Sequence, residues 1–133
     1  MKQSFSSHWI RSKQPRKQRK YRFNAPLHIK REFFSALLSK ELRKKYGTKH
    51  IIVKKGDKVK ILRGQYKNKI GKVEKVNLKR ERIFVQGAER TKKDGSKSFY
   101  PIHPSKVQIQ EMVLDDKKRK KSLERNTHGK KSY

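Results

Sequence analysis

The sequence contains no cysteine, which excludes a disulfide framework and a zinc site built from thiolates. Its five histidines are too scattered for metal-ligand spacing, so we expect neither a metal ion nor another cofactor. The chain has no run of about 18 apolar residues, and its start, MKQSFSSHWIRSK, lacks the apolar core of a signal peptide. We therefore expect a cytoplasmic protein without a membrane partner.

Acidic residues are also scarce. The 133 residues include 11 Asp and Glu against 40 Lys and Arg, which leaves a formal net charge of +29. Hydrophobic residues make up 31% of the chain, so one small domain with extensions is expected and a large core is excluded. Repulsion among so many positive charges destabilises a compact chain, so we expect a polyanion to compensate it. Because no membrane partner is expected, composition points to nucleic acid.

Catalytic motifs are missing as well. The sequence has no GxxxxGKS or GxxxxGKT, no HExxH and no GxSxG, and no helix is expected after GDKVKILRG as a dinucleotide site would need. Asp115 and Asp116 are adjacent, but neighbouring side chains do not face each other and no nucleophile accompanies them. We interpret them as solvated charge. The sequence therefore predicts no enzyme and no small-molecule substrate.

Residues 1–25 form a basic arm. Its stretch RSKQPRKQRKYRF contains no acid, and like charges of this kind stay extended in water until phosphates neutralise them. Aromatic rings suited to stacking on bases alternate there with cations suited to phosphates. A solubilising tail is the alternative interpretation. The residues of the arm that we predict to bind RNA are Arg11, Lys13, Arg16, Lys17, Arg19, Lys20, Tyr21 and Arg22.

Residues 26–47 show helical spacing, because apolar residues recur there at every fourth position in two neighbouring rows. Pro26 suits the first turn of a helix, and Ser39 suits the N-cap of a second short helix at LSKELRKKYG. Gly47 stands where a left-handed C-terminal cap belongs. The pattern predicts one helix or two, packed through the apolar stripe against the next domain.

Residues 48–114 have a period near two, with short β-rich runs such as KVKIL, GKVEKV and RIFVQ separated by turns. This spacing predicts a small barrel. Asp94 and Gly95 are a strong hairpin signal between mostly polar strands, so we expect that ribbon to project into solvent or RNA. The residues expected to point into the barrel are Val53, Val59, Ile61, Ile70, Val73, Val76, Ile83, Val85, Ile102, Val107 and Ile109.

Residues 115–133 form a charged tail with helical potential near 117–125.

The stretch VKKGDKVKILRGQYKNKIGKVEKV contains a cationic turn. Gly64 and Asn68 bracket it, and both residue types tolerate positive φ, so the chain can reverse there. Gly71 removes a side chain where another backbone approaches closely or where the strand bends. The turn exposes a cluster that we expect to contact phosphate. The cluster consists of Arg63, Tyr66, Lys67, Lys69 and Lys72.

Within this stretch, GDKVKILRGQYKNKIGKVEKV resembles the KOW motif, which implies an SH3-like barrel. QPRKQRKYRFNAPLHIKREFFSALLSKELRKKYG before it, and DGSKSFYPIHPSKVQI followed by LDD after it, are similar to the universal large-subunit ribosomal protein numbered twenty-four in bacteria, in its archaeal and eukaryotic form, called twenty-six in eukaryotes. The segments QPRKQRK and YPIHPSKV favour an archaeal over a eukaryotic source. At Asn68 the family commonly has glycine, and asparagine accepts the left-handed conformation that the turn needs.

This resemblance implies a mainly β protein, in which a basic arm and one or two short helices precede a small SH3-like barrel and a charged tail follows it. The implied function is to bind the 5′ part of large-subunit ribosomal RNA early in assembly, beside other ribosomal proteins and near the polypeptide exit tunnel. Carried over by position, RNA contacts fall on Arg16, Lys17, Arg19, Lys20, His28, Arg31, Arg63, Lys67, Lys69 and Lys72.

Residues 103–106 match the HPS turn of the family, so we add His103 and Lys106 to the predicted RNA-binding residues. A purely structural role of this turn is the alternative. Two other classes of protein stay open. A transcription-elongation factor also uses KOW barrels, beside polymerase, but lacks a basic arm. A general architectural DNA-binding protein would explain the charge but not the barrel.

Overall fold

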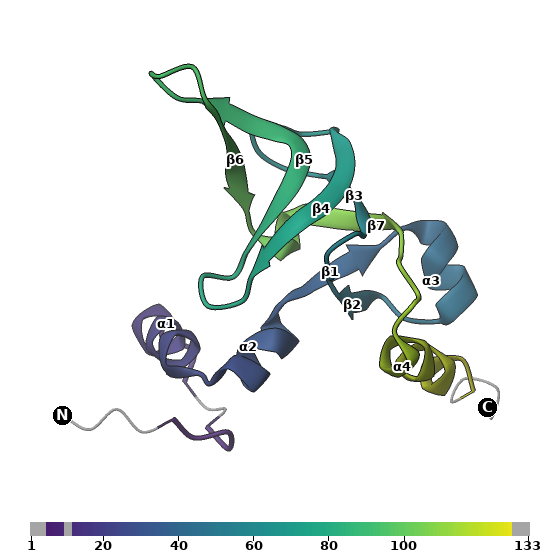
Figure 1. The fold of residues 1–133 in the computed structure, drawn as a ribbon. Helices are drawn as coiled ribbons and strands as arrows, with labels where there is room; N and C mark the ends of the chain where they lie inside the picture. Colours follow the sequence, from purple (N-terminus) through teal and green to yellow (C-terminus); the bar gives the residue numbers. More distant parts are fainter. Residues whose placement is uncertain (1–4, 10–11, 129–133) are drawn as a thin grey trace.

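The computed structural model describes residues 5–9 and 12–128, in which a bent sheet has helices gathered at one end (Figure 1). The helices are α1 (Pro15–Asn24), α2 (Leu27–Phe33), α3 (Lys40–Tyr46), the 3-10 helix η1 (Pro104–Lys106) and α4 (Lys117–His128). The strands are β1 (Ser35–Leu38), β2 (His50–Ile52), β3 (Lys58–Ile61), β4 (Ile70–Asn77), β5 (Arg82–Thr91), β6 (Lys97–Ile102) and β7 (Val107–Glu111).

The strands pair in the order β2-β1-β7-β3-β4-β5-β6. The pairs are antiparallel except for β1 with β7, which are parallel. The mainly β class is confirmed. Among the described residues, however, β2 and β6 are the two edges of an open sheet, so the expected SH3-like barrel is not confirmed. The sheet bends along β4, whose first residues pair with β3 and whose remainder pairs with β5.

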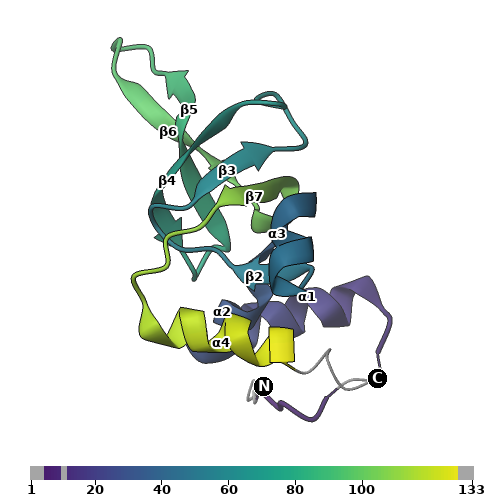
Figure 2. The same cartoon turned by 90° about the vertical axis from the view of Figure 1, so that its right-hand side faces the viewer.

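The expected β-hairpin at Asp94 and Gly95 is confirmed. It joins β5 to β6, Lys92 N donates to Ser96 O (2.8 Å), and Gly95 has φ 82°. In two perpendicular views the tip of this ribbon points away from α1, α2 and α4, which lie at the other end of the molecule (Figures 1 and 2). Its residues are mostly exposed, as the polar alternation predicts.

The core lies between the two halves of the bent sheet. Most of the residues expected to point inward are buried, and Val76 is partly buried against the core. The prediction for Ile70 is wrong, because this residue is 54% exposed. Cross-strand partners share a face, and Ile70 pairs with Lys60 on the outer face while Gly71 pairs with Val59 on the inner face. The core also contains Phe34, Ala36, Leu38 and Ala88.

The segment of residues 26–47 contains two helices, with strand β1 between them that its helical spacing did not predict. β1 alternates partly buried and buried residues and is held by β2 on one side and β7 on the other. The predicted caps of the second helix are confirmed. Ser39 Oγ accepts a hydrogen bond from Leu42 N (3.3 Å), and Gly47 ends α3 with φ 65°.

The arm was expected to be extended, but the structure has helix α1 over Pro15–Asn24. The proline suits the first turn, where a helix has no use for its missing N–H. Tyr21 connects this helix to its surroundings, because its ring lies 5.1 Å from that of Trp9 and 6.2 Å from that of Phe33. Arg22 adds an ion pair of 2.9 Å to Glu81, which lies in the β4–β5 turn.

The helix expected near residues 117–125 of the charged tail is present as α4, and it is anchored to the sheet. Arg119 of α4 is 5% exposed, and its two terminal nitrogens each donate to the Asp57 carboxylate over 2.7 Å. Asp116 is not simply solvated either. It accepts from Lys118 N (2.8 Å) at the start of the helix and pairs with Lys54, and the hydrogen bond from Lys54 holds its pKa below the usual value.

Candidate nucleic-acid interface

The β3–β4 turn has the conformation that its sequence predicts. Gly64 and Asn68 have positive φ values of 101° and 69°. Asn68 therefore adopts the left-handed conformation at the position where the family that the sequence resembles commonly has glycine. Asn68 N donates to Ile61 O (2.8 Å), and Ile61 N donates to Lys69 O (2.9 Å), which closes the base of the turn. The turn is therefore rigid at its base while its cations stay in solvent. The exposed cations are Arg63, Lys67, Lys69 and, just inside β4, Lys72.

Tyr66 anchors this turn to the neighbouring ribbon. Its hydroxyl donates to Glu89 O (2.7 Å), and its ring lies 5.3 Å from that of Tyr100 at an interplanar angle of 52°. The Lys69 ammonium lies 5.2 Å from the centre of the same ring. These contacts hold Tyr66 half-buried, whereas Tyr100 is 39% exposed and offers the more accessible ring for a base.

A recess of about 490 Å³ lies between this turn and η1. We call it the loop recess and define it by Arg63, Tyr66, Arg82, Tyr100, His103 and Lys106, which line it. None of the described residues along it is acidic. The structure thus brings together four predicted site residues from two separate segments. It adds two that sequence reasoning missed.

Of the two missed residues, Tyr100 had a signal, because it stands in the FYPIHPSKV stretch that carries the resemblance. Arg82 had none, since it is one of many cations along the chain and only the folding of β5 beside the other recess segments brings it to the recess. Arg82 donates to the neighbouring Glu81 O over 3.0 Å, which leaves further N–H groups for a ligand.

His103 has structural partners in this region. Its Nδ1 accepts from Ser105 N (3.2 Å) and lies 2.8 Å from Ser105 Oγ, which caps η1. Its Nε2 lies 3.4 Å from Glu81 Oε2, the same oxygen that pairs with Arg22. Glu81 therefore joins the arm to the HPS turn. These contacts favour the structural interpretation of His103, while Lys106 beside it is exposed.

The remaining predicted cations lie at the helical end of the molecule. On α1 the side chains of Arg16, Lys17, Arg19 and Lys20 are exposed, and Lys13 before it is exposed too. His28 and Arg31 are exposed on α2. Arg22 and Tyr21 are engaged by Glu81 and by aromatic rings, as described above. Arg11 lies outside the described residues.

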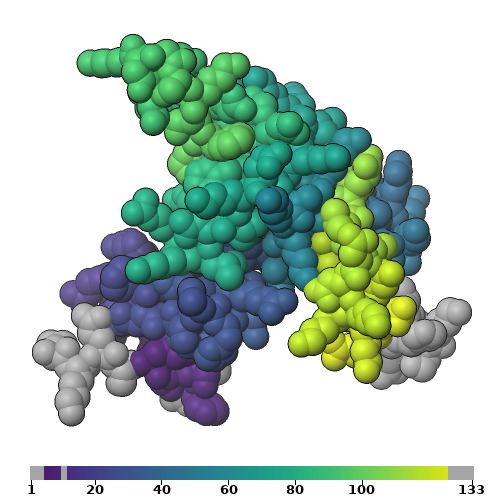
Figure 3. Space-filling model, viewed as in Figure 1, coloured from purple at the N-terminus to yellow at the C-terminus, as the bar shows by residue number. Residues whose placement is uncertain are grey.

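The predicted residues therefore form two groups rather than one. The space-filling view shows the arm against the β4–β5 turn region, with the β5–β6 ribbon extending in the opposite direction (Figure 3). The loop recess belongs to the β-sheet part of the molecule and the arm cations to its helical end. A ligand that contacts both groups must be long, as a folded polynucleotide is.

Other kinds of site find little support in the part of the chain that the structure describes. No three His, Cys, Asp or Glu side chains gather there in a way that could hold a metal ion. Within residues 5–9 and 12–128, no helix is long and apolar enough to cross a membrane.

Fold and surface together define a small, strongly basic β-sheet domain with a basic helical arm. Comparison with known families makes this specific, because the model that describes eukaryotic ribosomal protein L26 and its archaeal form, ribosomal protein L24, matches residues 12–126. The chain belongs to this family of large-subunit ribosomal proteins, as its resemblance predicted. The family is structural rather than enzymatic. The match includes α1 and most of α4, so both lie within the family domain.

Proposed function

We propose that the protein is a structural component of the large ribosomal subunit that binds ribosomal RNA through the arm and the loop recess. The observation that carries the proposal is the recess itself. It combines three cations and two tyrosine rings from the β3–β4 turn, β5, β6 and η1, without an acid among the described residues that line it. Cations suit phosphates and flat rings suit unpaired bases, and RNA offers both.

The arm supplies the second contact. Four exposed cations on α1, at positions 16, 17, 19 and 20, are related by steps of three and four residues, so they share one broad face of the helix. Such a face suits an RNA backbone that runs along one side of the helix and presents successive phosphates to it. Glu81 fixes the direction in which α1 leaves the sheet, through its ion pair with Arg22. RNA contacts by the arm and by the recess are thereby set at a constant separation.

The finer details of the proposal rest on the family. Assembly at an early stage on the 5′ part of large-subunit ribosomal RNA, a place near the exit of the polypeptide tunnel, contacts with neighbouring ribosomal proteins and a cytoplasmic location are proposed on that basis. A strongly basic protein is unstable against self-repulsion without its polyanion, and early addition supplies the polyanion soon after synthesis.

RNA binding can be tested by titrating the protein with a transcript of the 5′ part of large-subunit ribosomal RNA over a range of KCl concentrations. Replacing Lys67, Lys69 and Lys72 together with alanine should weaken binding and flatten the slope of log affinity against log salt by about 2 to 3 units. Thermal stability should stay nearly unchanged, because exposed cations contribute little to folding.

The matched control replaces three exposed lysines of α4 instead: Lys117, Lys120 and Lys121. It removes the same charge, so a change common to both variants reports net charge alone. Equal binding by the β3–β4 variant and the parent, at a salt concentration where the parent is half dissociated, would remove the turn from the interface. Sedimentation in a cell extract tests the wider proposal, which co-migration with polymerase instead of the large subunit would overturn.

A further inference from the structure

A second recess lies at the helical end of the molecule, between residues 5–9 and helix α1 (Figures 1 and 2). It has a volume of about 300 Å³, and we call it the arm pocket. Its walls contain three aromatic rings, two ammonium groups and one carboxamide. The residues that define it are Phe5, Trp9, Lys17, Lys20, Tyr21 and Asn24.

Two local features of the chain build this pocket. Trp9 N donates to Ser6 O (3.4 Å), which closes a turn and brings the rings of residues 5 and 9 to the same side chain of α1. On α1, residues three and four positions apart share one side of the helix. The residues on the side that faces the pocket are Lys17, Lys20, Tyr21 and Asn24.

Tyr21 is the centre of the aromatic wall. Its ring centre lies 4.9 Å from that of Phe5 and 5.1 Å from that of Trp9, with interplanar angles of 35° and 27°. All three residues are only partly buried. The rings therefore hold one another in place and still keep surface that a further flat ring can cover.

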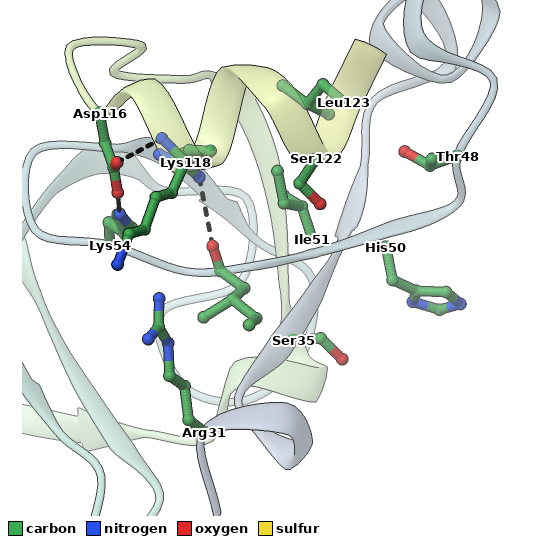
Figure 4. A pocket seen from close by; sticks show the side chains of 12 residues that line it. Arg31, Ser35, Thr48, His50, Ile51, Lys54, Asp116, Lys118, Ser122 and Leu123 are labelled. Atoms are coloured by element: carbon green, nitrogen blue, oxygen red, sulfur yellow. Dashed lines mark hydrogen bonds and ion pairs between the residues drawn. The ribbon is translucent and has the colours of Figure 1, made fainter. Parts of the chain in front are cut away.

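The charge of the arm pocket suits a polyanion. None of the described residues that line it is acidic, and its two lysines are exposed. The cavity between β2 and α4 is different, because there Asp116 pairs with Lys54 and accepts from Lys118 N (Figure 4). A carboxylate repels phosphate, so the arm pocket is the more suitable of the two for a nucleic-acid strand.

Two of the three rings lie outside the residues that match the family. The match begins at residue 12, whereas the rings come from Phe5 and Trp9. Membership of the family therefore does not account for the aromatic wall. The cations of α1, by contrast, lie within the matched residues.

We propose that the arm pocket holds one unpaired base of an RNA strand, an inference that rests on the proposed function of the arm. Every base has a flat face that stacks on aromatic side chains. The volume is at the lower end of the range for small-molecule sites, which fits one base. A base also brings its own phosphates to Lys17 and Lys20, as an apolar side chain of a protein would not. The Asn24 carboxamide can both donate to a base edge and accept from it.

The test uses Trp9, because it is the single tryptophan of the chain and it lines the pocket. The full-length protein is titrated with a single-stranded RNA of about eight nucleotides, a typical length for single-strand sites. A base that stacks in the pocket should quench the Trp9 fluorescence. The control ligand is an abasic strand of equal length, which keeps the phosphates and should bind without this quenching.

Two variants probe the pocket itself. Phe5→Leu removes one ring and should weaken the affinity measured at Trp9 about fivefold or more. Asn24→Ala keeps all three rings and should weaken it about threefold to tenfold. Phe23→Leu is the matched control, because Phe23 is a 79% exposed ring on the same helix outside the pocket.

The proposal is overturned if the abasic strand quenches Trp9 as strongly as the RNA does. It is also overturned if both pocket variants bind the RNA as the Phe23→Leu control does. Titration with the ribosomal RNA transcript separates this site from the proposed function. Binding of the transcript without a change at Trp9 would exclude the pocket and leave the proposed function intact, whereas failure to bind the transcript would overturn the proposed function.

Discussion

A methyl group at Gly71 should damage the fold more than any other single-carbon addition in the β3–β4 region. The position is on the inner face of β4, and a Cβ built there would lie 2.2 Å from Gln86 O and 3.0 Å from Val85 Cγ1. The nearer atom belongs to the backbone of β5, so it cannot rotate away as a flexible side chain would. Relief requires β4 and β5 to move apart at the point where the sheet bends.

We expect Gly71→Ala to lower the free energy of unfolding by about 3 kcal/mol, the upper end of the range for overpacking. Gly71→Val adds two further carbons and should cost more. The corresponding fall in Tm is about 9 to 18 °C for a chain of this length. Urea denaturation followed by circular dichroism measures the change, with the slope checked for two-state behaviour.

Gly64→Ala is the control, because no heavy atom lies within 4 Å of a Cβ at that position. Its φ of 101° makes alanine strained there, at a cost of about 1 to 2 kcal/mol. The comparison isolates the collision from the general loss of a glycine. If Gly71→Ala destabilises no more than Gly64→Ala, the close approach of β5 does not decide this position. RNA affinity of either variant should fall only as far as its folded fraction falls.

Three further outcomes are expected. Arg119→Ala should destabilise the protein by about 3 to 5 kcal/mol in urea titrations, because it leaves the Asp57 carboxylate buried without its cation; a loss below about 1 kcal/mol would contradict this. Deletion of residues 1–22 should flatten the salt slope of RNA binding by roughly 4 to 5 units if about six phosphate contacts are lost, and an unchanged slope would make the arm a passive extension. Asp116 has a pKa below its usual 3.8, so the stability that its charged form contributes is present above that pH and is lost as the pH falls through the lowered pKa. When the free energy of unfolding is measured at decreasing pH, the Asp116→Asn variant should lack this part of the loss in stability.

The features that sequence predicted are those set by neighbouring residues. Positive φ at Gly64 and Asn68, the caps at Ser39 and Gly47 and the inward valines all follow from local pattern, and the structure has them. The inward orientation predicted for Ile70 was wrong because the alternation of apolar residues does not show which positions face the core. The strand pairing decides this, since Gly71 pairs with Val59 on the inner face.

Long-range pairing explains what sequence could not predict. β1 is four residues long inside an apolar row with helical spacing, and its strand conformation depends on β2 and β7. Arg119 is one cation in a basic run, and nothing nearby shows that Asp57, 62 positions away, would bury it. Arg82 reaches the loop recess for a similar reason. Local pattern gives the turn and its cations, whereas the loop recess exists only in the folded chain.

The parallel pairing of β1 with β7 imposes an order on folding during synthesis. Leu38 pairs with Ile109, so one edge of β1 has no partner until nearly the whole sheet has left the ribosome. The antiparallel ribbons β3–β4 and β5–β6 need no such delay, because each is closed by a short turn. A nascent chain that stops before β7 exposes one edge of β1 and one edge of β3. β7, which is translated after the other strands of the sheet, therefore decides whether β1 is held against β3, and a product truncated before β7 would carry exposed strand edges prone to aggregation.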